Sequence, residues 1–148
     1  MTRAELLGFL RAHRLAVEAT ADSGGAVEAA VIGIAVSDTF EIVFDTLSTS
    51  RKARNLERNP RIALVIGGVL EGEERTVQIE GNADHPTGTE RERLQQLYLE
   101  VFPDGRDRLA WPDLVYVRVT PTWLRSSDYR SQPPAIVELD ATQLRELR

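Results

Sequence analysis

The chain has 148 residues, of which 42% are hydrophobic and 28% charged, and its formal net charge is −5 at neutral pH. This length and composition predict one folded domain with its own hydrophobic core and exclude a disordered chain. The negative charge argues against a nucleic-acid-binding protein that relies on a basic face. The sequence contains no cysteine, which excludes disulfides, thiolate metal sites and cysteine nucleophiles.

No segment of the sequence has the features of a membrane or secretion signal. No apolar run approaches the ~20 residues that a membrane-spanning helix needs. The N-terminal stretch MTRAELLGFLRAHR is amphipathic and lacks the continuous apolar region of a signal peptide. We therefore expect a cytoplasmic protein with no membrane partner.

The first third of the chain is predicted to form one helix and three strands. Thr2 and Glu5 fit a capping box, which begins a helix that ends near His13. Apolar runs separated by turn residues at 22–25 and 37–39 predict the strands that follow. These strands span residues 15–21, 26–36 and 40–45.

A short cationic helix comes next, with Ser50 as its predicted N-cap and Asn59-Pro60 as its stop. A second capping box, Thr89 with Glu92, predicts a later helix that ends at Pro103. The remaining predicted elements are strands at 61–69, 75–84 and 113–125, then a short extended piece and a final helical turn in the tail.

The order of these elements predicts the fold class. Short strands in hairpin order, with helices between only some of them, favour a mainly β fold whose antiparallel sheet closes or nearly closes. A doubly wound fold is not expected, because strands and helices do not alternate regularly. We find no internal repeat and no long linker, so residues 1–148 are predicted to form a single domain.

Most sequence motifs of catalysis are absent. The chain lacks the dinucleotide-binding pattern, the P-loop, the G-x-S-x-G nucleophile turn and the H-E-x-x-H zinc motif. We interpret His13 as a surface residue near a helix C-terminus and His85 as a loop residue, rather than as metal or heme ligands. No carboxylate pair stands out as acid and base. The sequence therefore predicts no metal site and identifies no catalytic residue.

The start of the cationic helix has an unusual charge. Arg51 and Lys52 occupy the first turn, where the helix dipole disfavours each exposed cation by about 0.3–1 kcal/mol. Four of the five residues at 46–50, just before them, carry hydroxyl groups. The free backbone amides of the helix start point towards the same place. Hydroxyls, amides and cations at a helix start are typical of a phosphate site, where each charge-assisted hydrogen bond contributes about 1.5–3 kcal/mol. The alternative is a solvated basic helix start whose cost is screened by salt.

The segment FDTLSTSRKARNLERNPRIALVI, residues 44–66, resembles the core signature of the pyridoxamine 5'-phosphate oxidase-like FMN-binding split barrels. In that family an aromatic-x-Thr strand end precedes a Ser-Arg-Lys helix start, an Asn-Pro stop and the next barrel strand. RTVQIEG, residues 75–81, resembles the strand that follows. The resemblance implies a six-stranded antiparallel Greek-key split barrel with a few short flanking helices. It also implies a homodimer with two FMN sites between the protomers.

The resemblance also implies which residues contact the cofactor. It assigns the FMN phosphate to Ser50, Arg51 and Lys52. It assigns the ribityl chain and the ring edge to Phe44, Asp45 and Thr46. The backbone along the isoalloxazine ring comes from Val31, Ile32, Gly33 and Ile34. Further contacts fall to Arg75, Thr76, Gln78 and Trp123, although Gln78 also fits an ordinary outward strand residue and Trp123 also fits a dimer interface.

The activity implied by the resemblance is that of an oxidoreductase in which FMN exchanges hydride with a small-molecule substrate. Alternatives remain open: a deazaflavin-dependent reductase, a non-catalytic flavin-binding protein, or a flavin-free barrel dimer. Some related barrels bind heme. True pyridoxamine-phosphate oxidases end with an arginine-bearing segment that grips the substrate phosphate, and the tail ATQLRELR does not resemble it. We therefore do not expect oxidation of vitamin B6 phosphates.

Overall fold

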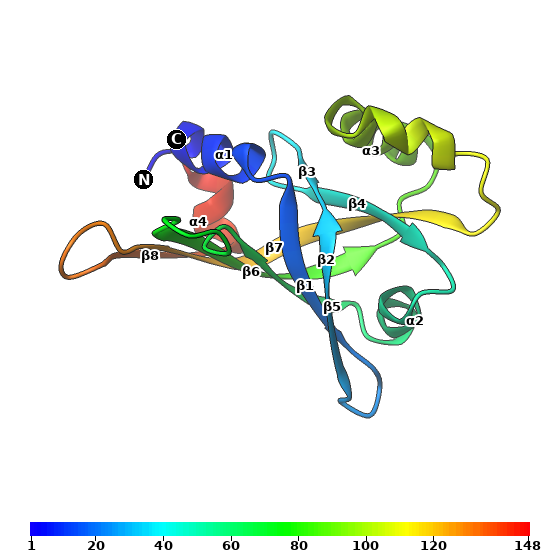
Figure 1. The fold of residues 1–148 in the computed structure, drawn as a ribbon, viewed down its shortest axis with the longest axis horizontal. Coiled ribbons are helices and arrows are strands. Elements are labelled where there is room, and N and C mark those ends of the chain that lie inside the picture. The colour runs from blue at the N-terminus through cyan, green and yellow to red at the C-terminus, as the bar shows by residue number, and fades with distance from the viewer.

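The computed structural model describes residues 1–148 as one curled antiparallel sheet with short helices around it (Figure 1). The sheet follows the order β2-β1-β5-β6-β7-β4-β3, and β8 pairs with β7. The strands are β1 Leu15–Ala21, β2 Val27–Gly33, β3 Ala35–Val36, β4 Ile42–Leu47, β5 Arg61–Ile66, β6 Arg75–Asp84, β7 Leu114–Asp128 and β8 Ala135–Asp140. The helices are α1 Arg3–Ala12, α2 Arg51–Arg58, α3 Gly88–Val101, the 3-10 helix η1 Pro103–Arg108 and α4 Ala141–Glu146.

The mainly β antiparallel fold is confirmed, but the sheet has eight strands rather than six. One extra strand arises because the predicted strand 26–36 is interrupted at Ile34, whose amide donates to the Arg14 carbonyl oxygen at 2.9 Å. The first part, β2, pairs with β1, and the second part, β3, pairs with β4. Since β2 and β3 occupy the two ends of the sheet order, this one segment connects the two edges of the curled sheet. The other extra strand, β8, is the predicted extended piece of the tail.

Several element boundaries differ from the sequence predictions. The third predicted strand begins at Ile42 rather than Phe40, because Phe40 lies in a turn with a φ of 64°. β5 ends at Ile66, since Gly67 turns the chain with a φ of 74° and a Cβ there would lie 2.8 Å from the Arg75 carbonyl oxygen. α3 begins at Gly88 after Thr87, so the predicted second capping box is wrong.

The barrel interior forms the main hydrophobic core. Alternate residues of the strands point inward, so β5 and β6 bury every second side chain. Helices α1 and α4 cover one end of the barrel, where the Arg3 amide donates to the Arg148 carbonyl oxygen at 2.8 Å (Figure 1). A smaller apolar cluster lies beneath α3. No helix of the structure is both long enough and apolar enough to cross a membrane.

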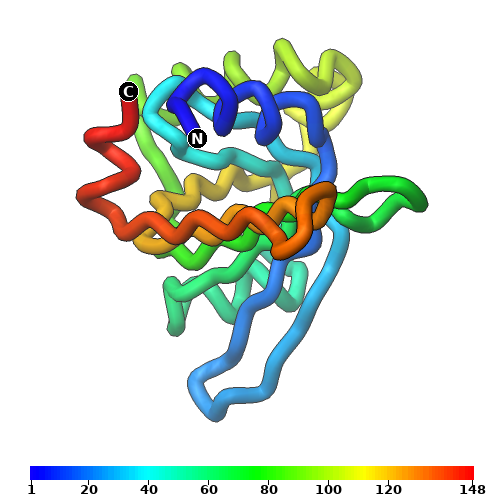
Figure 2. Tube along the Cα trace, turned by 90° about the vertical axis from the view of Figure 1, so that its left-hand side faces the viewer, coloured from blue at the N-terminus to red at the C-terminus, as the bar shows by residue number.

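The hairpin formed by β1 and β2 extends beyond the rest of the sheet, and α2 lies beside it (Figure 2). Apart from Arg61 at the start of β5, the outward side chains of β2, β1 and β5 are small or aliphatic and only partly covered. Register places Val17 between Val31 and Val65, and Ala19 between Ala29 and Ala63. We call this surface the outer apolar face; it consists of Leu15, Val17, Ala19, Ala21, Val27, Ala29, Val31, Ala63 and Val65.

Candidate cofactor site

The start of α2 has the geometry that the sequence predicts. Ser50 is the N-cap, and its hydroxyl accepts a hydrogen bond from the Ala53 amide at 3.2 Å. The same hydroxyl lies 3.1 Å from the Thr46 Oγ1 atom. Because the first amides of a helix have no intrahelical acceptor, those of Arg51 and Lys52 are available to a ligand. The helix start therefore presents amides and two hydroxyl groups together.

The two cations of the first turn point in different directions. Arg51 is exposed, and its Nη2 atom lies 3.5 Å from the Val27 carbonyl oxygen of β2. The Lys52 side chain is only 14% exposed, and its Nζ atom lies 3.7 Å from Glu18 Oε1 and 4.0 Å from Glu28 Oε1. The structure thus places Arg51 at the helix start and turns Lys52 towards the barrel. A contact of Lys52 with a phosphate stays a prediction.

Lys52 belongs to a buried polar cluster, which we define as Glu18, Glu28, Lys52, Thr20 and Asn55. The Thr20 hydroxyl donates to Glu28 Oε2 at 2.9 Å, and Asn55 Nδ2 donates to Thr20 Oγ1 at 3.0 Å. Glu18 is fully buried, and neither of its carboxylate oxygens has a hydrogen-bond partner. Burial, with the charge of Glu28 adding and that of Lys52 opposing, raises the pKa of Glu18 to about 7.

The motifs of the sequence did not predict this cluster, although the sequence contains a signal for it. Glu18 alternates with Ala16 and Thr20 on the inward face of β1, a position where a charged residue is rarely buried without a partner. The partners could not be found from the sequence, because they lie on β2 and α2.

The residues assigned to the ribityl chain and ring edge occupy three different environments. Phe44 is fully buried in the main core, and Thr46 contacts Ser50 at the helix start. Asp45 accepts hydrogen bonds from the Tyr98 hydroxyl at 2.9 Å and from Arg108 Nε at 2.8 Å. Burial, followed by the charge of Asp45, raises the pKa of Tyr98. Of the three, Thr46 is the one whose side chain faces the helix start.

Replacing Asp45 with asparagine is expected to lower stability without reducing cofactor occupancy. The carboxylate joins β4 to α3 and η1 through two side-chain donors, and losing a hydrogen bond to a charged group costs about 1.5–3 kcal/mol. Urea unfolding and the amount of bound cofactor per chain would measure the two effects separately. Loss of cofactor from the folded variant would instead support a direct contact between Asp45 and the ligand.

The segment assigned to the isoalloxazine ring is accessible only on its outer side. Val31 is 67% exposed on the outer apolar face, whereas Ile32 and Ile34 belong to the core. Gly33 lies against Phe102, and a Cβ at this glycine would approach the Phe102 ring to 2.8 Å. A planar ring that follows this backbone would therefore have to lie on the side of Val31.

The residues of β6 that the resemblance assigns to the cofactor lie, within one protomer, at the opposite end of that strand from α2. Arg75 and Thr76 pair with Asp128 and Ser127, whereas α2 leads into Arg61, which pairs with the other end of β6. The Arg75 guanidinium lies 4.5 Å from the centre of the Phe9 ring.

Two further assigned residues sit on the outside of the sheet or close to it. Gln78 is exposed and stands between Val65 and Arg125 in the register. Trp123 is half-buried and pairs with Glu80 on one side and Asp140 on the other. In the register of the sheet, Gln78 lies beside Val65 of the outer apolar face, and Trp123 lies one strand further from that face.

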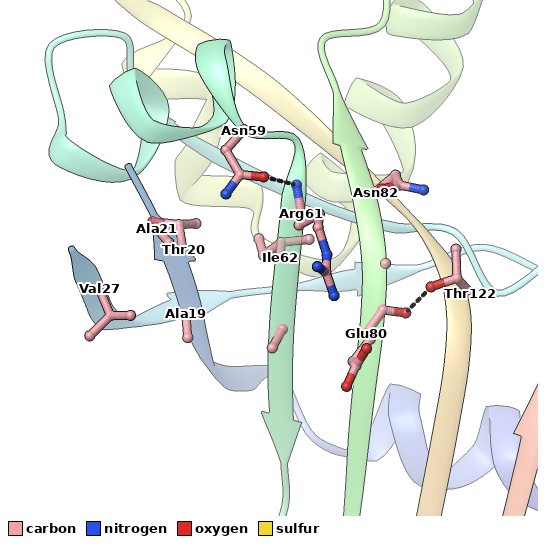
Figure 3. A pocket seen from close by; sticks show the side chains of 12 residues that line it. Ala19, Thr20, Ala21, Val27, Asn59, Arg61, Ile62, Glu80, Asn82 and Thr122 are labelled. Carbon is pink, nitrogen blue, oxygen red and sulfur yellow. Dashed lines mark hydrogen bonds between the residues drawn. The ribbon is translucent and has the colours of Figure 1, made fainter. Parts of the chain in front are cut away.

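A pocket of about 330 Å³ lies where the outer apolar face meets the end of α2 (Figure 3). Ala19, Ala21 and Ala63 contribute its apolar side. Arg61 and Glu80 contribute charged groups from β5 and β6. The pocket therefore gives the outer apolar face a polar margin.

Comparison with known proteins decides the family. The sequence matches the family model described as pyridoxamine 5'-phosphate oxidase over residues 2–128. The chain belongs to the pyridoxamine 5'-phosphate oxidase family. This confirms the resemblance found in residues 44–66. A search of curated proteins found no match.

Solved structures of the same fold include proteins with different ligands. A heme binding protein from Mycobacterium smegmatis superposes with a TM-score of 0.83 at 16% identity, covering 99% of this chain and 61% of that one. The heme storage protein HutZ from Vibrio cholerae has a TM-score of 0.70 at 17% identity, covering 79% of this chain and 87% of that one. A pyridoxamine 5'-phosphate oxidase-related, FMN binding protein from Nostoc punctiforme has a TM-score of 0.68 at 13% identity, covering 95% and 88%. At these identities the similarity establishes the fold alone.

In this pyridoxamine 5'-phosphate oxidase family member, the structure brings part of the predicted site together. Thr46, Ser50 and Arg51 meet at the start of α2, and Arg51 contacts β2 at Val27. From there, the outer side of β2 leads to Val31. The candidate site therefore runs from the α2 start along β2 onto the outer apolar face.

Proposed function

We propose that this protein binds FMN and acts as a flavin-dependent oxidoreductase on a small-molecule substrate. The observation that carries the proposal is the Ser50-capped start of α2, with exposed Arg51 beside it, in a family that includes FMN-binding members. Ser50, Thr46 and the first amides of α2 would hold the phosphate, and Arg51 would balance its charge. Bound FMN would supply hydride transfer at its ring.

The same proposal includes a homodimer. The outer apolar face exposes Val27, Leu15 and Val31 by 77%, 57% and 67% of their surface. Contiguous apolar surfaces of this kind mark protein interfaces. A two-fold axis through this face would bury it against its own copy and would place a second chain beside Val31, where the flavin ring would lie. The partner would then exclude water from the ring.

The decisive experiment is identification of the cofactor. Protein purified without added cofactor is denatured, and the released small molecule is identified by mass and absorbance. FMN at about one molecule per chain is the expected result. A deazaflavin in its place would keep the phosphate site and change the ring chemistry. No flavin of either kind, even after incubation with FMN, would overturn the proposal.

Heme binding is the second candidate, favoured by the similarity to two heme proteins. The chain offers two histidines as iron ligands. In His13, Nδ1 lies 2.8 Å from the Phe9 carbonyl oxygen and Nε2 lies 3.4 Å from Glu73 Oε1, so both ring nitrogens have partners. The other, His85, has Nδ1 3.4 Å from the Tyr116 carbonyl oxygen. A heme absorbance band after titration with hemin would favour this candidate over FMN.

A redox cycle distinguishes an oxidoreductase from a protein that only binds flavin. Bleaching of the flavin by a nicotinamide nucleotide, followed by re-oxidation with an added acceptor, is the expected behaviour of an oxidoreductase. A flavin that is released by denaturation but is not reduced by any nicotinamide nucleotide would favour a non-catalytic flavin-binding protein.

Pyridoxamine phosphate and pyridoxine phosphate are not expected to be substrates. A substrate phosphate needs its own cations, and most arginines of the C-terminal third already pair with carboxylates. Arg108 pairs with Asp45 and Asp104, Arg118 with Glu41, Asp84 and Glu90, Arg125 with Glu138, and Arg130 with Asp128. Oxygen consumption with either compound at about 1 per second or more would contradict this prediction.

A further inference from the structure

The position of Lys52 conflicts with a permanent role at the helix start. Its ammonium lies between Glu18 and Glu28, at 3.7 Å and 4.0 Å, and both distances exceed those of a charge-assisted hydrogen bond. Lys52 is nevertheless in the first turn of α2, beside the amides and hydroxyls of the candidate phosphate site. Lys52 is therefore close both to the buried carboxylates and to the candidate phosphate site, and each of these attracts a cation.

The two carboxylates of the cluster are not equally satisfied. Glu28 accepts from the Thr20 hydroxyl, which Asn55 in turn supports. Glu18 has no hydrogen-bond donor on either oxygen and is fully buried. An ionised carboxylate in this position is stabilised by Lys52 alone, whereas a protonated one does not need the cation. Glu18 is therefore the group that would take up a proton if Lys52 left.

The surroundings of Glu18 contain no other charge that could replace Lys52. On β2 the charged residue that faces it is Glu28, and on α2 it is Lys52. On the β5 side, Ile62 and Leu64 are buried and apolar. If Lys52 moves away, the buried negative charge of Glu18 must then be removed by protonation of Glu18 itself.

We propose that Lys52 is shared between the buried carboxylates and an anion at the start of α2, so that anion binding is coupled to protonation of Glu18. When the phosphate binds, Lys52 turns outward to it, and Glu18 takes one proton from solvent. When the anion leaves, Glu18 releases the proton and Lys52 returns. Glu18 is thus a positioning residue for Lys52, the cation that binds the phosphate. The inference rests on the proposed function for the identity of the anion, but not for the arrangement of the cluster.

Thermodynamic reciprocity gives the coupling a definite sign. Uptake of one proton with the anion makes affinity fall as pH rises above the value at which free Glu18 ionises, by up to about tenfold per pH unit. A phosphate monoester has its second ionisation near about pH 6, so its own charge is constant over the range that matters. Any change of FMN affinity with pH above about 7 therefore comes from ionisation of the protein and not of the phosphate.

The test compares FMN affinity between about pH 7 and pH 9 in four proteins. Wild type is expected to lose affinity with rising pH. E18Q is expected to show no such loss and to bind about tenfold or more tightly than wild type at the upper pH, because no carboxylate ionises to draw Lys52 inward. K52M is expected to bind weakly and without the pH dependence. E57Q, which removes an exposed carboxylate from the same helix, is the matched control and is expected to follow wild type.

A second readout does not depend on FMN. Carboxyl-carbon NMR follows the titration of Glu18, and either the K52M substitution or saturating inorganic phosphate is expected to raise its midpoint. An unchanged midpoint in both cases would overturn the proposal, as would equal pH slopes for E18Q and wild type. Absence of FMN binding at every pH would overturn the proposed function instead, and the titration with phosphate would still decide the coupling.

Discussion

Replacing Arg51 by glutamate is expected to weaken FMN binding by at least about tenfold while leaving the fold intact. The side chain is exposed at the helix start and its one hydrogen bond is a long one to the Val27 carbonyl oxygen, so the folded protein loses little. The bound phosphate would lose a charge-assisted hydrogen bond, which contributes about 1.5–3 kcal/mol, and would face a like charge. Flavin fluorescence during titration of the cofactor-free protein measures the change.

Arg58 provides the matched control for this substitution. It is an exposed arginine in the last turn of the same helix, so R58E makes the same change in net charge far from the N-terminus. Equal loss of affinity in both variants would mean that net charge, rather than a phosphate contact, determines binding. Substitution of Lys52 would be less informative here, because K52E would bring a third carboxylate towards Glu18 and Glu28.

Replacing Val31 by aspartate is expected to convert the proposed homodimer to a monomer and to remove bound FMN with it. Val31 is 67% exposed in the single chain and lies across from Val17 on the outer apolar face. A two-fold interface would bury two such aspartates without partners, and each buried charge costs several kcal/mol. Light scattering or sedimentation at micromolar concentration measures the mass, and absorbance of the same sample measures the flavin.

Val69 is the matched control for Val31. It is 68% exposed, but it lies in the loop between β5 and β6 rather than on the outer apolar face. V69D is expected to remain a dimer with its flavin. A wild-type monomer at micromolar concentration would contradict the proposed interface, and a V31D monomer that retains FMN would separate the cofactor site from the dimer.

Local sequence patterns were sufficient for the elements around α2. The Ser50 cap, the Asn59-Pro60 stop and strands β1 and β6 were all predicted correctly. A cap is a hydrogen bond between residues three positions apart, and strand alternation repeats every two residues, so both depend on neighbours in the chain. The family followed from the same segment, because its signature is continuous.

Only the tertiary structure decided how the site residues are used. Lys52 turns inward because β1 and β2 bring two carboxylates beneath α2. The Asp45 carboxylate is occupied because it accepts hydrogen bonds from Tyr98 of α3 and Arg108 of η1. The interruption at Ile34 has the same origin, since one segment pairs first with β1 and then with β4 at the other edge of the sheet. These outcomes depend on partners tens of residues away, which no local pattern encodes. The sequence by itself determined the fold family and the location of the candidate phosphate site, whereas side-chain direction and burial came from packing between distant segments.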